Sequence, residues 1–100
     1  MKLVIAIVNE GHAVEIVDRL VEKGFRVTRL SSTGGYMRKG SATLFSGVPD
    51  EEVIMVTKVI KDYVEFQKIK ALNENDEEEY QRLSATIFIL PIEEMLQVSP

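Results

Sequence analysis

The sequence has no cysteine and no tryptophan, and only one histidine, His12, among its 100 residues. Without cysteine the chain can form neither disulfides nor thiolate metal sites, and it offers no cysteine nucleophile. A single histidine argues against a histidine-based metal site within one copy. The sequence therefore predicts neither a metal nor a cofactor.

Long apolar runs are also missing. The N-terminal run from Leu3 to Val8 spans six residues, which is shorter than a secretory signal core, and nothing approaches the ~20 apolar residues that cross a bilayer. The net charge of −4 argues against a general nucleic-acid or anionic-membrane surface. We expect a cytoplasmic protein with no nucleic-acid or membrane partner.

What is present is the composition of one folded domain. Hydrophobic residues make up 45% of the chain and charged residues 28%, too apolar for a disordered chain of this modest charge. A chain of this length can bury roughly 60–70% of its unfolded surface. The sequence predicts a single domain over residues 1–100.

The first half of the chain alternates strand and helix patterns. Lys2–Val8 is β-rich and apolar on both faces, as in a central strand. Asn9 is placed to cap a following helix, and Lys23 with Gly24 marks the end of that helix. Residues 25–32 then alternate as a second strand. Its inward side chains are predicted to be Phe25, Val27 and Leu30.

The second half repeats the alternation after a Gly-rich connection at 33–40. We predict a strand at Ser41–Gly47, a helix opened by Pro49 and Asp50, and a strand at Ala85–Leu90. The buried stripe of that helix is predicted to be Val53, Val56, Ile60 and Tyr63. The acidic run 73–79 is interpreted as a solvated loop, and residues 92–97 as a short turn or helix.

The resulting order is β-α-β-β-α-β, which is typical of an α+β, ferredoxin-like sandwich with two helices on one face of an antiparallel sheet. The other face stays uncovered in a single copy. Strands that are apolar on both faces, Lys2–Val8 and Ala85–Leu90, would expose a large apolar patch there. We therefore expect an oligomer of this chain.

A cationic stretch surrounds the Gly-rich connection. Residues 23–39 contain five Lys or Arg residues and no acid, together with several hydroxyls. Guanidinium groups, hydroxyls and free backbone N–H groups suit phosphate, and Tyr36 could stack on a base. A long hairpin loop with solvated charges would explain the same residues without any ligand.

A resemblance to a known family favours the interpretation of this stretch as a ligand site. Residues 24–48, GFRVTRLSSTGGYMRKGSATLFSGV, resemble the PII-like cyclic-di-AMP receptor family, and residues 2–8 and 86–91 resemble its first and last strands. The resemblance implies a ferredoxin-like homotrimer with ligand sites in the clefts between subunits.

The same resemblance implies site residues. Arg26 and Thr28 would contact phosphate or base, and Gly47 would allow close approach of the ligand. The other implied positions are Gly35, Tyr36 and Met37, which would shape the base pocket, and Ser41, which stands where the family has Asn. Gly24 also replaces a family Asn, and residues 64–84 are shorter and more acidic than in the family.

Two functional hypotheses follow. The first is a PII-like signalling protein that binds a nucleotide second messenger, most plausibly cyclic-di-AMP, and signals through its loops to an unknown downstream protein. The second is a module of the same fold that acts through protein contacts without a nucleotide. We do not predict an enzyme, because no nucleophile or general base is indicated. His12 is interpreted as a surface residue.

Overall fold

Four strands form one antiparallel sheet in the computed structural model, which describes residues 1–31, 40–94, 96 and 98. The strands are β1 (Lys2–Asn9), β2 (Thr28–Ser31), β3 (Ser41–Val48) and β4 (Ala85–Pro91). Their order is β2-β3-β1-β4, so β1 and β3 lie in the centre and β2 and β4 at the edges. This confirms the predicted ferredoxin-like sheet.

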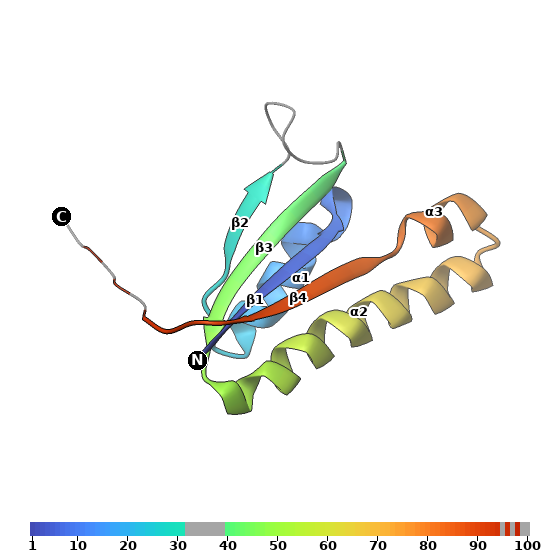
Figure 1. Cartoon of the computed structure of the whole chain (residues 1–100). Helices are drawn as coiled ribbons and strands as arrows, with labels where there is room; N and C mark the ends of the chain where they lie inside the picture. Colours follow the sequence, from blue (N-terminus) through green and yellow to red (C-terminus); the bar gives the residue numbers. More distant parts are fainter. Residues whose placement is uncertain (32–39, 95, 97, 99–100) are drawn as a thin grey trace.

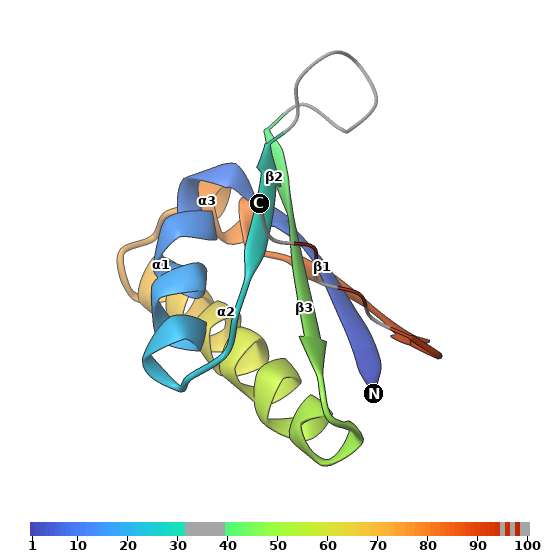
Figure 2. The same cartoon turned by 90° about the vertical axis from the view of Figure 1, so that its left-hand side faces the viewer.

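The helices cover one face of this sheet. They are α1 (Glu10–Glu22), a short 3-10 helix η1 (Asp50–Glu52), α2 (Val53–Asn73) and α3 (Glu77–Arg82). Figure 2 shows α1 and α2 on the same side of the sheet, while α3 lies at the end of α2 before the chain enters β4 (Figure 1). The two-layer arrangement follows from the buried apolar stripe that each long helix turns toward the sheet.

The core lies between the sheet and these helices. Every second residue of β1 points toward them, because side chains of a strand alternate between its faces. Val4, Ala6 and Val8 are accordingly buried. They pack with Ala13, Ile16 and Leu20 of α1 and with three residues of the stripe predicted for α2, which are Val56, Ile60 and Tyr63.

The opposite face of the sheet is open and apolar. Residues that pair across antiparallel strands share a face, so the partners of Leu3 and Ile5 on β3 and β4 lie there with them. Ile7, Phe88 and Leu90 on this face are exposed. We call this set the open face; it comprises Leu3, Ile5, Ile7, Thr28, Leu30, Phe45, Gly47, Phe88 and Leu90.

The prediction that Leu30 points inward was wrong. Leu30 pairs with Thr43, and its side chain, 47% exposed, lies on the open face. Phe25 and Val27 do pack against the core, as predicted, but from a segment that precedes β2. The odd positions stay on the helix side as the ladder begins, since Arg29 pairs with buried Leu44, and the same alternation turns Leu30 to the open face.

Two predictions for the C-terminal half also need correction. The run 73–79 is not a loop throughout: α2 continues to Asn73, and α3 begins at Glu77. Asp76 caps α3 by accepting a hydrogen bond from the Glu79 N–H at 3.0 Å, and acids in a first helical turn interact favourably with the helix dipole. No helix forms in residues 92–94, 96 and 98, the described part of the tail.

The predicted ends of α1 are confirmed. The Asn9 side chain accepts a hydrogen bond from the Gly11 N–H at 2.8 Å. Lys23 follows the last residue of the helix, and Gly24 then adopts φ +90°, a conformation that favours glycine. None of the helices in the described residues is long and apolar enough to cross a membrane.

Candidate functional site

Three of the predicted site residues lie together at one end of the sheet. The Ser46 hydroxyl donates a hydrogen bond to the Arg26 carbonyl at 2.8 Å, which holds the segment before β2 beside the end of β3. Gly47, the residue after Ser46, lies on the open face, and Thr28 pairs with Phe45 on that same face. We call Arg26, Thr28 and Gly47 the strand-end group. Within the described residues the Arg26 guanidinium forms no ion pair, so it is free to bind an anion.

Ser41 lies in a different place, at the beginning of β3. It lines a pocket of about 440 Å³ at the end of the sheet where β1 finishes and β4 starts. We call this the polar pocket; it is lined by Ile7, Val8, Asn9, Gly40, Ser41, Gln81, Arg82, Ser84 and Thr86. Hydroxyls, amides and one guanidinium dominate this lining, which suits a polar, anionic ligand.

The length of β3 separates the two groups. Gly47 and Ser41 are six positions apart on one strand, which corresponds to about 20 Å at ~3.3 Å per residue. A single copy therefore does not bring all the predicted ligand residues into one cavity.

Gly35, Tyr36 and Met37 lie outside the described residues. The two ends of the segment that carries them are described at Ser31, the last residue of β2, and at Gly40. The Glu10 N–H donates a hydrogen bond to the Gly40 carbonyl at 2.8 Å, so this end of the segment is tied to the start of α1. Gly40 has φ +84°, which turns the chain into β3 at the mouth of the polar pocket.

The guanidinium of Arg82, which lines the polar pocket, already forms an ion pair. Arg82 Nη2 lies 2.9 Å from Glu78 Oε1, one turn earlier on α3. Both side chains are largely exposed, and such pairs contribute only about 0.3–0.5 kcal/mol. A phosphate that offers a bidentate contact could therefore compete with Glu78 for Arg82.

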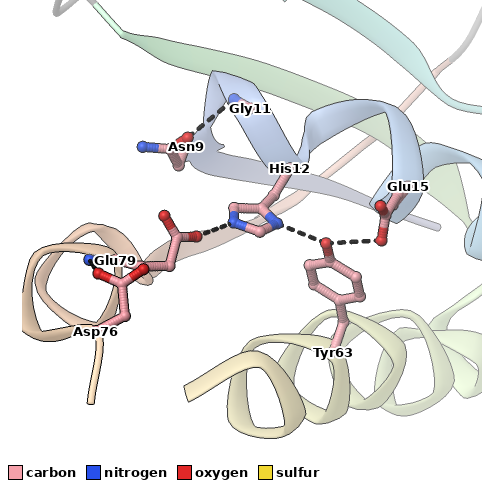
Figure 3. Close-up of polar contacts among 7 residues, drawn as sticks. All are labelled: Asn9, Gly11, His12, Glu15, Tyr63, Asp76 and Glu79. Carbon is pink, nitrogen blue, oxygen red and sulfur yellow. Dashed lines mark hydrogen bonds and ion pairs between the residues drawn. The ribbon is translucent and has the colours of Figure 1, made fainter. Parts of the chain in front are cut away.

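A polar network connects the helices that cover the sheet (Figure 3). His12 Nδ1 is 2.6 Å from the Tyr63 hydroxyl, and His12 Nε2 is 2.5 Å from Glu79 Oε1. The Tyr63 hydroxyl donates a hydrogen bond to Glu15 Oε2 at 2.9 Å. We call His12, Glu15, Tyr63 and Glu79 the helix network. It joins α1, α2 and α3.

The interpretation of His12 as a surface residue was therefore wrong. Its side chain is 19% exposed, and both ring nitrogens have partners. The partners lie 51 and 67 positions away in the chain, so no local spacing in the sequence indicates them. Only the packing of α2 and α3 against α1 brings them together.

Tyr63 is held in its neutral form by this setting. Burial, and then the hydrogen bond to the Glu15 carboxylate, raise the pKa of the Tyr63 hydroxyl from 10.0 to about 12. The Arg19 guanidinium lies 5.1 Å from the centre of the ring and partly opposes this rise. Tyr63 thus remains a hydrogen-bond donor throughout the physiological pH range.

A family model described as "Cyclic-di-AMP receptor" matches residues 1–98. The chain belongs to this family. The match spans the strand-end group, the polar pocket and the helix network, so all three are parts of one family domain.

The same PII-like fold recurs among solved structures similar to this receptor-family chain. A functionally unknown protein from Pediococcus pentosaceus ATCC 25745 is 24% identical, with a TM-score of 0.68, over 97% of this chain and 96% of that one. CPII, a nitrogen regulatory PII-like protein from Thiomonas intermedia K12 bound to ADP, AMP and bicarbonate, is 16% identical, with a TM-score of 0.58, over 89% and 83%. CPII from the same organism, bound to ADP, AMP and acetate, is 18% identical, with a TM-score of 0.55, over 89% of this chain and 82% of that one.

The sequence analysis did not predict that α3 contributes residues to the polar pocket. Gln81 and Arg82 line the polar pocket, yet the acidic residues before them suggested a solvated loop. A signal was available: Asp76 at the cap, three Glu in the first turn and Arg82 in the last turn are typical of a short helix. This helix carries a cation back to the sheet.

Proposed function

We propose that this chain is a non-enzymatic signalling protein that binds cyclic-di-AMP in the clefts of a homotrimer and signals through the connection between β2 and β3. The observation that carries the proposal is the division of the predicted ligand residues between the two ends of β3, with an uncovered apolar face beside them. Membership of the cyclic-di-AMP receptor family supports the choice of ligand.

The chemistry of each group suits part of such a ligand. Among the described residues Arg26 has no ion-pair partner, so its guanidinium can bind a phosphate, and Thr28 offers a hydroxyl next to it on the same face. Gly47 leaves space where a side chain would stand. The polar pocket adds Ser41, and Arg82 adds a second cation. Gly35, Tyr36 and Met37 are proposed to complete the base pocket from the adjoining segment.

Assembly would complete the site. The open face exposes Ile7, Leu30, Phe88 and Leu90, each between 36% and 49% exposed. Burying apolar surface of this kind contributes about 25 cal/mol per Å², so a second copy would cover it favourably. Each copy would then present its strand-end group to the polar pocket of a neighbour. Two regions about 20 Å apart in one copy would meet on one ligand.

Calorimetry with cyclic-di-AMP, ATP and ADP tests the ligand. We expect binding of cyclic-di-AMP at micromolar strength or better, and no heat at roughly 100 µM ligand would refute the proposal. Arg26→Ala should weaken binding at least tenfold, because it removes a charge-assisted contact. Arg29→Ala is the matched control: Arg29 lies next to Thr28 on β2 but pairs with buried Leu44 and lies on the helix side, 4.0 Å from Glu10.

A subunit-mixing experiment tests the composite site. Arg26→Ala and Ser41→Asp should each abolish tight binding as pure proteins. Co-refolded at equal amounts, they should recover about one quarter of the sites, because only a cleft with Arg26 from one copy and Ser41 from the other is intact in a random closed oligomer. Recovery of no sites would show that each ligand takes both residues from the same copy.

A nucleotide-independent interaction module is the second candidate. It is favoured by the pairing of Arg82 with Glu78 and by the acidic residues of α3, which would repel a dianion near the polar pocket. Capture of a downstream protein that is insensitive both to nucleotides and to Arg26→Ala would favour this function over the first.

A further inference from the structure

The helix network contains more hydrogen bonds than a neutral tyrosine and a neutral histidine can supply with protons. It has three contacts: Glu15 with Tyr63, Tyr63 with His12, and His12 with Glu79. We propose that closing this network takes up one proton, and that His12 is thereby a positioning residue that holds α3, and with it Gln81 and Arg82, at the polar pocket in a pH-dependent way.

The proton count follows from the chemistry of the groups. An ionised carboxylate only accepts hydrogen bonds, a tyrosine hydroxyl donates once, and a neutral imidazole donates once. Tyr63 donates to Glu15, so His12 Nδ1 must donate to the Tyr63 oxygen. His12 Nε2 must also donate, because it faces Glu79 Oε1. Both ring nitrogens therefore carry hydrogen, and His12 is an imidazolium when the network is closed.

Charged groups of both signs surround the ring. The groups that face the network are Glu15 and Arg19 from α1, Tyr63 from α2 and Glu79 from α3. Two carboxylates favour the added proton, whereas Arg19 over the Tyr63 ring and the amino-terminal end of α1 oppose it. Removing the proton leaves two donors for three contacts and takes the charge from the pair with Glu79, which weakens that contact.

The consequence reaches the polar pocket through a short helix. Glu79 lies three positions before Arg82 on α3, and Gln81 and Arg82 both line the pocket. Because α3 has only six residues, a weakened contact at Glu79 affects the position of both pocket residues. One proton changes the docking equilibrium of α3 by up to about tenfold per pH unit.

NMR of the ligand-free chain tests the inference. His12 is the only histidine, so its ring-nitrogen signals need no assignment. While the network is closed we expect both nitrogens to be protonated, and the amide signals of Tyr80, Gln81 and Arg82 to move together with the ring as the pH rises. A neutral ring in the chain with α3 docked, or α3 amides that ignore the ring titration, would overturn the proposal.

Glu15→Gln is the decisive variant. The new amide can donate to the Tyr63 oxygen, Tyr63 can then donate to Nδ1, and a neutral ring can donate from Nε2 to Glu79. All three contacts are filled without the extra proton, so His12 should be neutral while α3 stays docked. Asp18→Asn is the control, since Asp18 is an exposed acid of α1 outside the network. A purely structural role for His12 predicts no difference between these two variants.

A binding experiment connects this inference to the proposed function, on which only its ligand arm rests. The affinity for cyclic-di-AMP should depend on pH in the wild-type chain, and this dependence should vanish in Glu15→Gln. Absence of binding at any pH would refute the proposed ligand and leave the NMR result intact. Binding that is equally pH-dependent in both proteins would overturn the link from the helix network to the pocket.

Discussion

Alkaline unfolding of the Tyr63→Phe variant isolates the free energy stored in one buried hydroxyl. The pKa of Tyr63 rises from 10.0 to about 12 in the folded chain, mainly through burial and then through the hydrogen bond to Glu15. The folded state therefore holds this proton more tightly than the unfolded chain does. The resulting stabilisation is complete below pH 10 and is lost as the pH rises to about 12. A rise of this size corresponds to roughly 2–3 kcal/mol at ~1.4 kcal/mol per pH unit.

Urea unfolding of both proteins at a series of pH values measures this quantity. Below pH 10 we expect wild type to be more stable than Tyr63→Phe by about 1 kcal/mol or more, because the variant loses the contacts to Glu15 and His12. Between pH 10 and 12 wild type should lose roughly 2–3 kcal/mol more than the variant. Lysine titration affects both proteins equally and cancels. A constant difference across that range would refute the reasoning.

Three further predictions concern the fold. Ile16→Ala should cost about 2–5 kcal/mol in urea unfolding, because Ile16 is 1% exposed, whereas Ile54→Ala, at a position 76% exposed, should cost less than about 0.5 kcal/mol. Gly24→Ala should cost roughly 1 kcal/mol through its φ of +90° alone, since a Cβ there would contact nothing. Phe88→Glu should reduce the proposed oligomer to monomers in analytical ultracentrifugation, because it places a charge on the open face.

The regular elements could be predicted because their signals are local. The strand pattern of β1 and the helical stripe of Val56, Ile60 and Tyr63 in α2 are carried by neighbouring residues, and the structure confirms them. Leu30 was placed wrongly because its apolar side chain suggested an inward position, whereas the register with β3 puts it on the apolar open face. The helix network was not predicted, since its members meet only after α2 and α3 have packed on α1.

The resemblance supplied candidate site residues without their layout in space. The residues around 26–47 resemble a ligand motif as one continuous stretch, but a strand extends its residues along a line. Arg26 and Gly47 therefore lie at one end of β3, and Ser41 lies at the other. The sequence does not show that α3 returns to the end of the sheet, so the contribution of Arg82 to the polar pocket could not be predicted.

The proposed assembly and the proposed ligand site would share one continuous surface of this molecule. Thr28 and Leu30 are neighbours on the same face of β2, so one residue of the strand-end group stands directly beside one of the open-face apolar side chains. A copy that covers Leu30 would bring its own edge against Thr28. The affinity for the ligand and the affinity between copies would then be thermodynamically linked, because a ligand held by both copies stabilises the assembled form by mass action. A charge at Phe88, which is not among the proposed ligand residues, should on this reasoning weaken ligand binding, and saturating ligand should in turn partly restore the oligomer.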